Sequence, residues 1–331
     1  MSTETSEQRR THQGVATAAA DLGNEGNLPS FEGATKWLNS SPLTPAGLRG
    51  RVVVVQFWTY TCINWLRTHP YVRAWAKRYR DDGLMVIGVH TPEFAFEHDL
   101  ENVQRQARAM GVEWPIVVDN EYEVWRAFAN HYWPALYFVD ARGAIRHHRF
   151  GEGDYERSEM VIRQLLADAG VDALAEGLAT IEATGLEAEA DWADLGSPET
   201  YTGSDQATNF EPSNPARLRL NHWSLAGDWT VRPDAVALNK PGGRIAFQFH
   251  ARDVHLVMGP ASQGETVRFR VLLDGRPAGA AHGADVDPEG RGAVQDQRTY
   301  QLIRQPKPIT DRRFEIEFLD GGVEAFCFTF G

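Results

Sequence analysis

Residues 58–66 of this chain read WTYTCINWL. They follow an apolar run, Val52 to Phe57, which predicts a buried strand, and they precede a stretch with apolar side chains at helical spacing. The helical positions are Val72, Trp75, Ala76 and Tyr79. Cys62 therefore lies where a strand turns into a helix, and the free N–H groups and dipole of a helix N-terminus stabilise a thiolate. We expect a reactive thiol with a pKa below the ordinary value of about 8.5.

Strand and helix patterns alternate from residue 28 to residue 170. Apolar runs predict strands at residues 52–57, 84–89, 115–118, 135–139 and 145–150. Helical spacing predicts helices at residues 64–79, 98–110, 122–128 and 155–169. Asp154 precedes the last helix and is expected to cap it. Strand-helix-strand units followed by a hairpin and a helix predict an α/β domain in three layers.

The character of the sequence changes after residue 170. Residues 171–215 begin with a short helical stretch and continue as an acidic segment, which predicts a linker. From residue 216 to residue 331 the periodicity becomes two, and Gly-rich turns separate the runs. The alternating apolar side chains include Ile245, Phe247, Phe249, Val267, Phe269, Val271, Phe314, Ile316 and Phe318. This pattern predicts an all-β domain, an antiparallel β-sandwich or jelly roll.

Composition limits the class of protein and its partners. A chain of 331 residues is long enough for two domains with separate cores, and its net charge of −12 argues against nucleic acid and anionic lipid as partners. No apolar run reaches the roughly 18 residues that span a bilayer. Residues 1–27 are polar and lack an apolar signal-peptide core, so we expect a disordered arm. With two cysteines and no export signal, we expect a cytoplasmic protein with reduced thiols.

The other ligand-like residues favour structural interpretations. Cys327 alternates with phenylalanines in a terminal run, which predicts a buried, inert thiol. His147 and His148 are adjacent on a strand, so their side chains point to opposite faces and share no metal. The acidic residues 285–290 are interpreted as a turn rather than a calcium loop. We therefore expect neither a metal nor a cofactor.

Residues 28–170 resemble the thioredoxin-like family of TlpA and redoxin proteins, and more narrowly the soluble C-terminal half of DipZ-like cytochrome c biogenesis proteins. The segments that carry the resemblance are FWTYTCIN at 57–64, GVHTPEFAFE at 88–97, YWPA at 132–135 and FGEGDY at 150–155. The resemblance continues over residues 220–331, where those proteins have a β-sandwich similar to carbohydrate-binding modules. It implies a thioredoxin fold followed by a sandwich. Trp223 and Trp229 of that sandwich are candidates for stacking on a glycan, although core tryptophans are the commoner interpretation.

The resemblance also implies roles for individual residues. Cys62 is then the attacking cysteine, Pro134 a cis-proline that holds the Trp133 backbone beside it, and Glu93 an acid that assists proton transfer. We predict that side chains around the thiol bind substrate, and these are Trp58, Tyr60, Asn64, Trp65 and Trp133. The sequence departs from the family at Trp65, which stands where the family has its second cysteine. The sequence also has no counterpart of the membrane-spanning half of DipZ-like proteins.

Three functions are compatible with these residues. The preferred one is a thiol-disulfide oxidoreductase that uses the single thiol of Cys62 on a disulfide-containing protein or a small oxidised thiol, with an external thiol as reductant. The second is a one-cysteine peroxidase, since Thr59 and Cys62 match part of a peroxiredoxin site, although Val55 stands where that motif has proline. The third is a non-enzymatic module that binds a peptide or a glycan.

Overall fold

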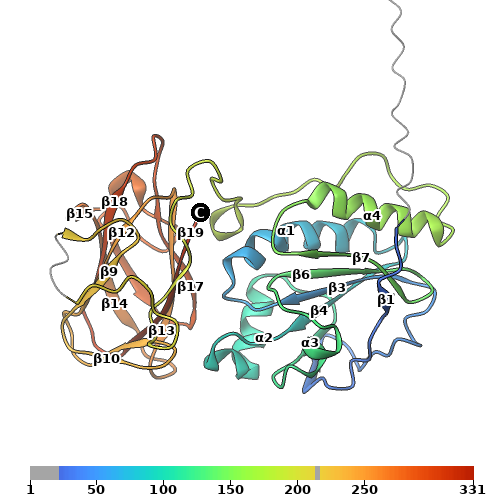
Figure 1. Ribbon diagram of the computed structural model, residues 1–331, viewed down its shortest axis with the longest axis horizontal. Coiled ribbons are helices and arrows are strands. Elements are labelled where there is room, and N and C mark those ends of the chain that lie inside the picture. The colour runs from blue at the N-terminus through green and yellow to red at the C-terminus, as the bar shows by residue number, and fades with distance from the viewer. Residues whose placement is uncertain (1–21, 213–216) are drawn as a thin grey trace, which may run out of the picture.

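The computed structural model describes residues 22–212 and 217–331, so most of the arm predicted at residues 1–27 lies outside the described residues. An α/β domain and an all-β domain lie side by side, and the C-terminus lies at their junction (Figure 1). This arrangement confirms the predicted fold class, a thioredoxin-like α/β fold followed by a β-sandwich. Among the described residues, no helix has the length and apolar character of a membrane span.

A seven-stranded sheet forms the centre of the α/β domain, in the order β1-β7-β6-β3-β4-β5-β2. Its strands are β1 (Gly26–Asn27), β2 (Lys36–Leu38), β3 (Val52–Trp58), β4 (Leu84–His90), β5 (Ile116–Val118), β6 (Ala135–Val139) and β7 (Ala144–Phe150). β3, β4 and β5 are parallel, whereas β6 and β7 run antiparallel to their neighbours. All seven residues of β3 are buried, as expected for a central strand covered on both faces.

Helices cover both faces of this sheet. They are α1 (Ile63–Arg78), the 3-10 helix η1 (Ala95–His98), α2 (Leu100–Ala109), α3 (Glu123–Ala127) and α4 (Tyr155–Asp168). Side chains of α1, α2 and α4 share one core with Val54, whereas Val124 of α3 packs on the opposite face with Val55. Right-handed crossovers from β3 to β4 and from β4 to β5 place α1 and α2 on the same face. The connection through α3 runs back across the sheet on the other face.

Two details of this domain differ from the sequence-based predictions. The short edge strands β1 and β2 were not predicted, because two or three residues are too few to show a period. β1 pairs with β7, so residues 26–27 belong to the sheet and not to the arm. Asp154 does precede α4, but its side chain makes no capping hydrogen bond, and its φ of 55° places it in the left-handed region.

The all-β domain consists of two antiparallel sheets. One has the order β10-β11-β19-β13-β17 with β8 paired to β19, and the other has the order β15-β14-β18-β12-β9 with β16 paired to β14. The strands of the first sheet are β8 (Thr200–Tyr201), β10 (Trp229–Val231), β11 (Val236–Leu238), β13 (Asp253–Pro260), β17 (Arg298–Arg304) and β19 (Val323–Phe330). Those of the second are β9 (Trp223–Ala226), β12 (Arg244–Phe249), β14 (Val267–Leu273), β15 (Arg276–Pro277), β16 (Arg291–Val294) and β18 (Arg312–Phe318). A short 3-10 helix, η4 (Gly279–Ala281), follows β15.

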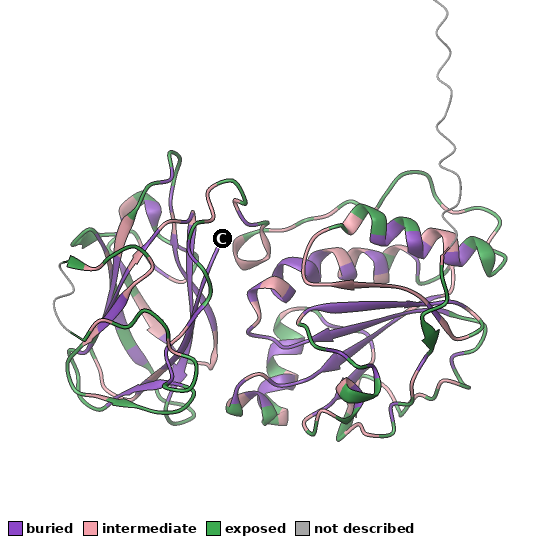
Figure 2. Ribbon diagram, in the orientation of Figure 1, coloured by how far each residue is buried: buried purple, intermediate pink, exposed green. Residues whose placement is uncertain are grey.

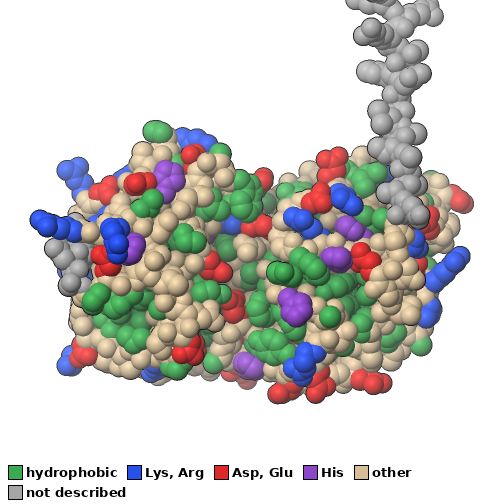
Figure 3. Space-filling view, viewed as in Figure 1, with side chains coloured by type: hydrophobic (Ala, Val, Ile, Leu, Met, Phe, Trp, Pro, Cys, Tyr) green, Lys and Arg blue, Asp and Glu red, His purple; other side chains and the backbone are tan. Residues whose placement is uncertain are grey.

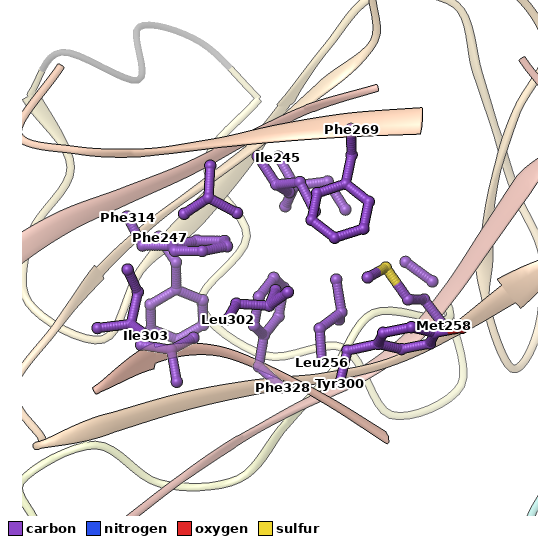
Figure 4. Close-up of a cluster of buried hydrophobic side chains, with 14 of the residues drawn as sticks. Ile245, Phe247, Leu256, Met258, Phe269, Tyr300, Leu302, Ile303, Phe314 and Phe328 are labelled. Carbon is purple, nitrogen blue, oxygen red and sulfur yellow. The ribbon is translucent and has the colours of Figure 1, made fainter. Parts of the chain in front are cut away.

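The sandwich core lies between these two sheets, as the period-two pattern predicts. Figure 4 shows Phe247 and Phe314 from the second sheet facing Phe328 from the first. In β14 buried and exposed residues alternate up to the turn at its end, whereas β13 is buried along its whole length. The two buried faces of β13 indicate that its sheet is covered on the side away from the sandwich core as well (Figure 2).

The segment between the domains differs from the predicted linker at residues 171–215. Its described part, residues 171–212, contains no α-helix, only a 3-10 turn at η2 (Gly185–Glu187). Its C-terminal part adds β8 to the sandwich, because Thr200 and Tyr201 pair with β19. Arg73 on α1 makes two hydrogen bonds to the Glu187 carboxylate, which fastens the segment to the α/β domain.

The sheet that contains β13, β17 and β19 packs against the α/β domain. Phe326 lies with its ring 4.8 Å from that of Phe96 on η1. At the rim, Arg105 on α2 forms an ion pair with Asp296 at 3.0 Å. Arg67 on α1 donates a hydrogen bond to the Phe330 carbonyl at 2.8 Å. The interface thus combines an aromatic centre with polar contacts, while acidic and basic side chains are interspersed over the outer surface drawn in Figure 3.

Replacing Phe247 by alanine should lower the free energy of unfolding by about 3–5 kcal/mol, because the side chain is fully buried and leaves a cavity between the sheets. Leu319→Ala is the matched control, since Leu319 is 43% exposed in the same domain, and it should change stability by less than about 0.5 kcal/mol. Denaturant unfolding followed by circular dichroism measures both. Equal effects of the two substitutions would contradict the packing described here.

Candidate functional site

Cys62 lies at the N-cap position of α1, directly after the loop that leaves β3. Its carbonyl accepts the first helical hydrogen bond from Leu66 N–H at 2.9 Å. The N–H groups of Asn64 and Trp65 point toward its sulfur and act to lower the pKa of the thiol. The strand-turn-helix expected from the sequence is therefore present, with the thiol at the helix N-terminus.

The loop before β6 lies beside this thiol. The Trp133–Pro134 peptide bond is cis, as predicted, and the Cys62 Sγ lies 3.8 Å from the Trp133 carbonyl oxygen. Pro134 is buried, whereas the Trp133 side chain is half-buried and packs on Trp125 with ring centroids 4.4 Å apart. The structure thus brings Cys62, Trp133 and Pro134 together, and the half-buried Asn64 is adjacent on the first turn of α1.

Glu93 stands in the loop between β4 and η1, close enough to Cys62 for its charge to raise the pKa of the thiol. Its Oε1 accepts a hydrogen bond from the Tyr201 hydroxyl of the sandwich domain. Burial, together with the nearby charge of Glu97, raises the pKa of the Glu93 carboxyl to about 8. The group therefore carries a proton over much of the neutral range and is able to give or take one near pH 8.

A second carboxylate, Glu97, organises the loops around the thiol. Its Oε1 accepts hydrogen bonds from the Thr61 hydroxyl at 2.7 Å and the Thr61 N–H at 3.3 Å, and its Oε2 accepts from the N–H groups of Glu93 and Phe94 at 2.7 and 3.0 Å. Glu97 is fully buried, and burial raises its pKa while these donors oppose the change. It therefore fixes Glu93 relative to the residue before Cys62. Glu97 ends the segment GVHTPEFAFE, but its role was not predicted, because a single glutamate near a helix start carries no distinguishing sequence signal.

Three of the predicted substrate-binding side chains lie in the protein core instead. Trp58, Tyr60 and Trp65 have no exposed surface. Trp65 stacks on Trp58 with centroids 4.5 Å apart and lies 4.9 Å from the ring of His69. A Cβ at Gly88 would lie only 2.8 Å from Trp58 Nε1, which shows how closely this cluster is packed. These three side chains pack beneath the loop that carries Cys62 and expose no surface to a substrate in this conformation, so the prediction that they bind substrate is corrected.

The expectation of a low pKa at Cys62 is also wrong. Burial raises the pKa of the Cys62 thiol well above its ordinary value, and the charge of Glu93 raises it further. The helix N–H groups act in the opposite direction but do not compensate for the lost hydration. The N-terminus of α1 is visible in the sequence, whereas the packing of the sandwich domain against the Cys62 loop is not. In the resting protein the thiol form is favoured.

The sandwich domain supplies contacts to the site that the sequence did not indicate. Thr299 on β17 donates a hydrogen bond from its hydroxyl to the Thr61 carbonyl at 2.6 Å, next to Cys62. Tyr201 on β8 reaches Glu93. Such contacts join residues more than a hundred positions apart, and no local pattern encodes them.

The candidate metal ligands and the two candidate glycan-binding tryptophans have different surroundings in the described part of the chain. No group of three or more His, Cys, Asp or Glu side chains is arranged to hold a metal ion among residues 22–212 and 217–331. Trp223 is 1% exposed and donates from Nε1 to the Thr208 carbonyl, so it belongs to the sandwich core. Trp229 is half-buried and donates to the Ala226 carbonyl.

Comparison with known proteins agrees with this geometry. The AhpC/TSA family matches residues 26–148, and the family described as a thioredoxin-like C-terminal domain matches residues 197–331. Protein DipZ of Mycobacterium bovis is 37% identical over 274 residues, which cover 78% of this chain and 38% of DipZ. The chain has a thioredoxin-like fold and is similar in sequence to DipZ over both of its domains.

Other thioredoxin-like proteins match only the α/β domain. The thiol-disulfide oxidoreductase YkuV of Bacillus subtilis is 27% identical over 141 residues, which cover 43% of this chain and 95% of YkuV. A solved structure, the solution structure of a thioredoxin-like protein in the oxidized form, is 28% identical, with a TM-score of 0.40 over 43% of this chain and 96% of that chain. The chain spans 38% of the length of DipZ.

The raised pKa of Cys62 predicts slow alkylation of the native thioredoxin-like protein at neutral pH, because only the thiolate reacts. The midpoint of the rate against pH, followed for the Cys62 peptide by mass spectrometry, should lie above that of the unfolded chain. Glu93→Gln removes a charge and should lower this midpoint without bringing it below the unfolded value, since burial is the larger cause. Glu101→Gln, an exposed glutamate on α2, is the control. A native midpoint at or below the unfolded one would contradict the buried site.

Proposed function

We propose that this protein is a thiol-disulfide oxidoreductase in which Cys62 attacks a disulfide of a protein or of a small oxidised thiol. The observation that carries the proposal is the position of the Cys62 sulfur at the N-terminus of α1, 3.8 Å from the Trp133 carbonyl at the cis-Pro134 loop. The backbone groups of this loop are available to pair with an extended substrate strand. The similarity to the thiol-disulfide oxidoreductase YkuV supports the same function.

The first chemical step exchanges one disulfide for another. The Cys62 thiol loses its proton, the thiolate attacks one sulfur of the substrate R–S–S–R′, and a mixed disulfide Cys62–S–S–R forms. The sulfur–sulfur bond of the substrate breaks, and R′–S⁻ leaves and takes up a proton. A second thiol must then attack the mixed disulfide, releasing R–SH. The side chain of Trp65 carries no thiol for that step, so the second thiol comes from outside the turn that holds Cys62.

Glu93 is the residue that we assign to the proton transfers. Its carboxyl group titrates near pH 8, so the carboxylate takes the proton from Cys62 and the acid returns it to the leaving thiolate. A cavity of about 100 Å³, lined by Glu93 and Tyr201, lies at the domain junction and admits water to this carboxyl. A pKa of Glu93 near the working pH matters here, because burial raises the free energy of a Cys62 thiolate that forms without a nearby base.

The test uses a peptide linked to glutathione through a mixed disulfide, with reduced glutathione as the second thiol. The wild-type protein should accelerate release of the peptide thiol, and Cys62→Ser should reduce the rate to that of the buffer. Peroxide consumption by the wild type, measured in parallel, should remain far slower than the exchange. Fast peroxide consumption would favour the peroxidase, and full activity of the Cys62→Ser protein would favour a binding module.

Replacing Trp65 by cysteine restores a thiol one turn after Cys62. We expect Trp65→Cys to exceed the wild type in the rate of dithiothreitol-driven reduction of protein disulfides and, on oxidation, to form a disulfide between Cys62 and the introduced thiol. The lost indole should cost about 3–5 kcal/mol of stability, because Trp65 is fully buried. Trp65→Ala leaves a comparable cavity without a thiol and should show the stability loss alone. A folded Trp65→Cys protein with neither new activity nor new disulfide would contradict the proposed orientation of the site.

A further inference from the structure

The second cysteine of the chain lies at the domain junction. Cys327 is on β19, where it is opposite Val257 of β13 on one side and Tyr201 of β8 on the other. Its side chain is 2% exposed and belongs to a small cluster that also contains Phe94 of the α/β domain and Phe326. The prediction of a buried thiol is therefore confirmed, but the surroundings are the interface with the α/β domain and not the sandwich core.

Register across the sheet shows which way the Cys327 side chain points. Val257 pairs with Cys327 and also with Thr299 on β17, so these three residues lie in one row across β17, β13 and β19. Residues directly opposite each other on neighbouring strands have side chains on the same face of a sheet. The Thr299 hydroxyl reaches the Thr61 carbonyl, so this face is the one that covers the active-site loop. Cys327 therefore faces the α/β domain.

The two neighbours of Cys327 in this row contact the two sides of the candidate site. Tyr201 donates to Glu93, and Thr299 donates to the residue before Cys62. Adjacent strands are about 4.8 Å apart, so Tyr201 and Thr299 lie about 5 and 10 Å from Cys327 across the sheet. Cys327 thus lies in the sheet between the strand that contacts Glu93 and the strand that contacts the Cys62 loop. In agreement, the pKa of the Cys327 thiol is raised, chiefly by burial, and the charges of Glu93 and Cys62 raise it further.

We propose that Cys327 is the resolving thiol of this oxidoreductase and forms an interdomain disulfide with Cys62. The inference rests on the proposed function, because it supplies the second thiol that the turn after Cys62 does not contain. It assigns the β-sandwich a catalytic contribution: the domain carries a reacting sulfur to the site.

The step balances as an ordinary thiol-disulfide exchange. Cys327 gives its proton to the Glu93 carboxylate, and its thiolate attacks the Cys62 sulfur of Cys62–S–S–R. The Cys62–Cys327 bond forms, the bond to the substrate sulfur breaks, and R–S⁻ leaves with a proton from Glu93. The substrate disulfide has then gained two electrons, and the two protein thiols have lost them. An external dithiol, such as dithiothreitol, reduces the interdomain disulfide and returns the protein to its starting state.

Bond formation also ties the two domains together. Both thiols are free in the structure, and a disulfide would hold their two Cα atoms about 4.4–6.8 Å apart. The start of α1 is then fixed to β19 by a covalent bond. We expect the oxidised protein to have a more rigid junction and its segment 171–199 to be cleaved more slowly by a protease than that of the reduced protein.

The experiment treats the full chain with oxidised glutathione and maps cysteine-containing peptides without reduction. The wild type should lose two hydrogens and yield one cross-linked species that joins the Cys62 and Cys327 peptides, independent of protein concentration. Cys327→Ala should instead accumulate a stable glutathione adduct on Cys62. Circular dichroism checks that this variant folds, and the wild-type map alone decides the outcome if it does not.

The possible failures are distinguishable. A wild-type protein that retains glutathione on Cys62, with Cys327 still alkylatable after unfolding, would overturn the role of Cys327 while leaving the proposed attack by Cys62 intact. Absence of any adduct or cross-link at Cys62 in both proteins would overturn the proposed function itself. A cross-link that appears only between two chains would also overturn the inference, because the proposed disulfide joins Cys62 and Cys327 of the same chain.

Discussion

The half-buried position of Cys62 beside the β-sandwich is the constraint on which the rest of the site depends. A helix N-terminus alone would favour the thiolate, yet the surrounding packing removes part of the water that a charged sulfur requires, and this desolvation raises the pKa of the thiol. Cys62 is consequently unreactive until a base takes the proton of its thiol. Glu93, whose own pKa is raised to about 8 by the same burial, is placed to do so.

The same packing explains why the turn after Cys62 tolerates an indole. Trp65 fills the core between Trp58 and His69 and is part of the structure that holds α1 against the sheet. The α/β domain therefore keeps the attacking sulfur, the cis-Pro134 loop and the acid, whereas the second sulfur lies on the other domain. The sandwich is in this account a part of the site: its Thr299 and Tyr201 fix the loop and the acid, and Cys327 lies between them.

Periodicity and turn residues were sufficient to predict the main elements. The fully buried β3, the alternation in β14 and the strand-helix boundary at Cys62 follow from local patterns of apolar side chains. The edge strands β1 and β2 were missed because they are too short to show a period. The pKa of Cys62 and the placement of Trp65 were wrong because both depend on burial by distant segments. Glu97, Tyr201 and Thr299 act through contacts that sequence spacing does not reveal.

The most direct test of this account is the equilibrium of the protein with glutathione at a fixed ratio of oxidised to reduced form and increasing total concentration. An intramolecular disulfide releases two glutathione molecules, so its fraction should fall as the total rises. A mixed disulfide on Cys62 releases only one, so its fraction would stay constant. We predict a falling fraction of oxidised wild-type protein, counted by trapping free thiols with an alkylating agent. A constant fraction would contradict the pairing of Cys62 with a thiol from the sandwich.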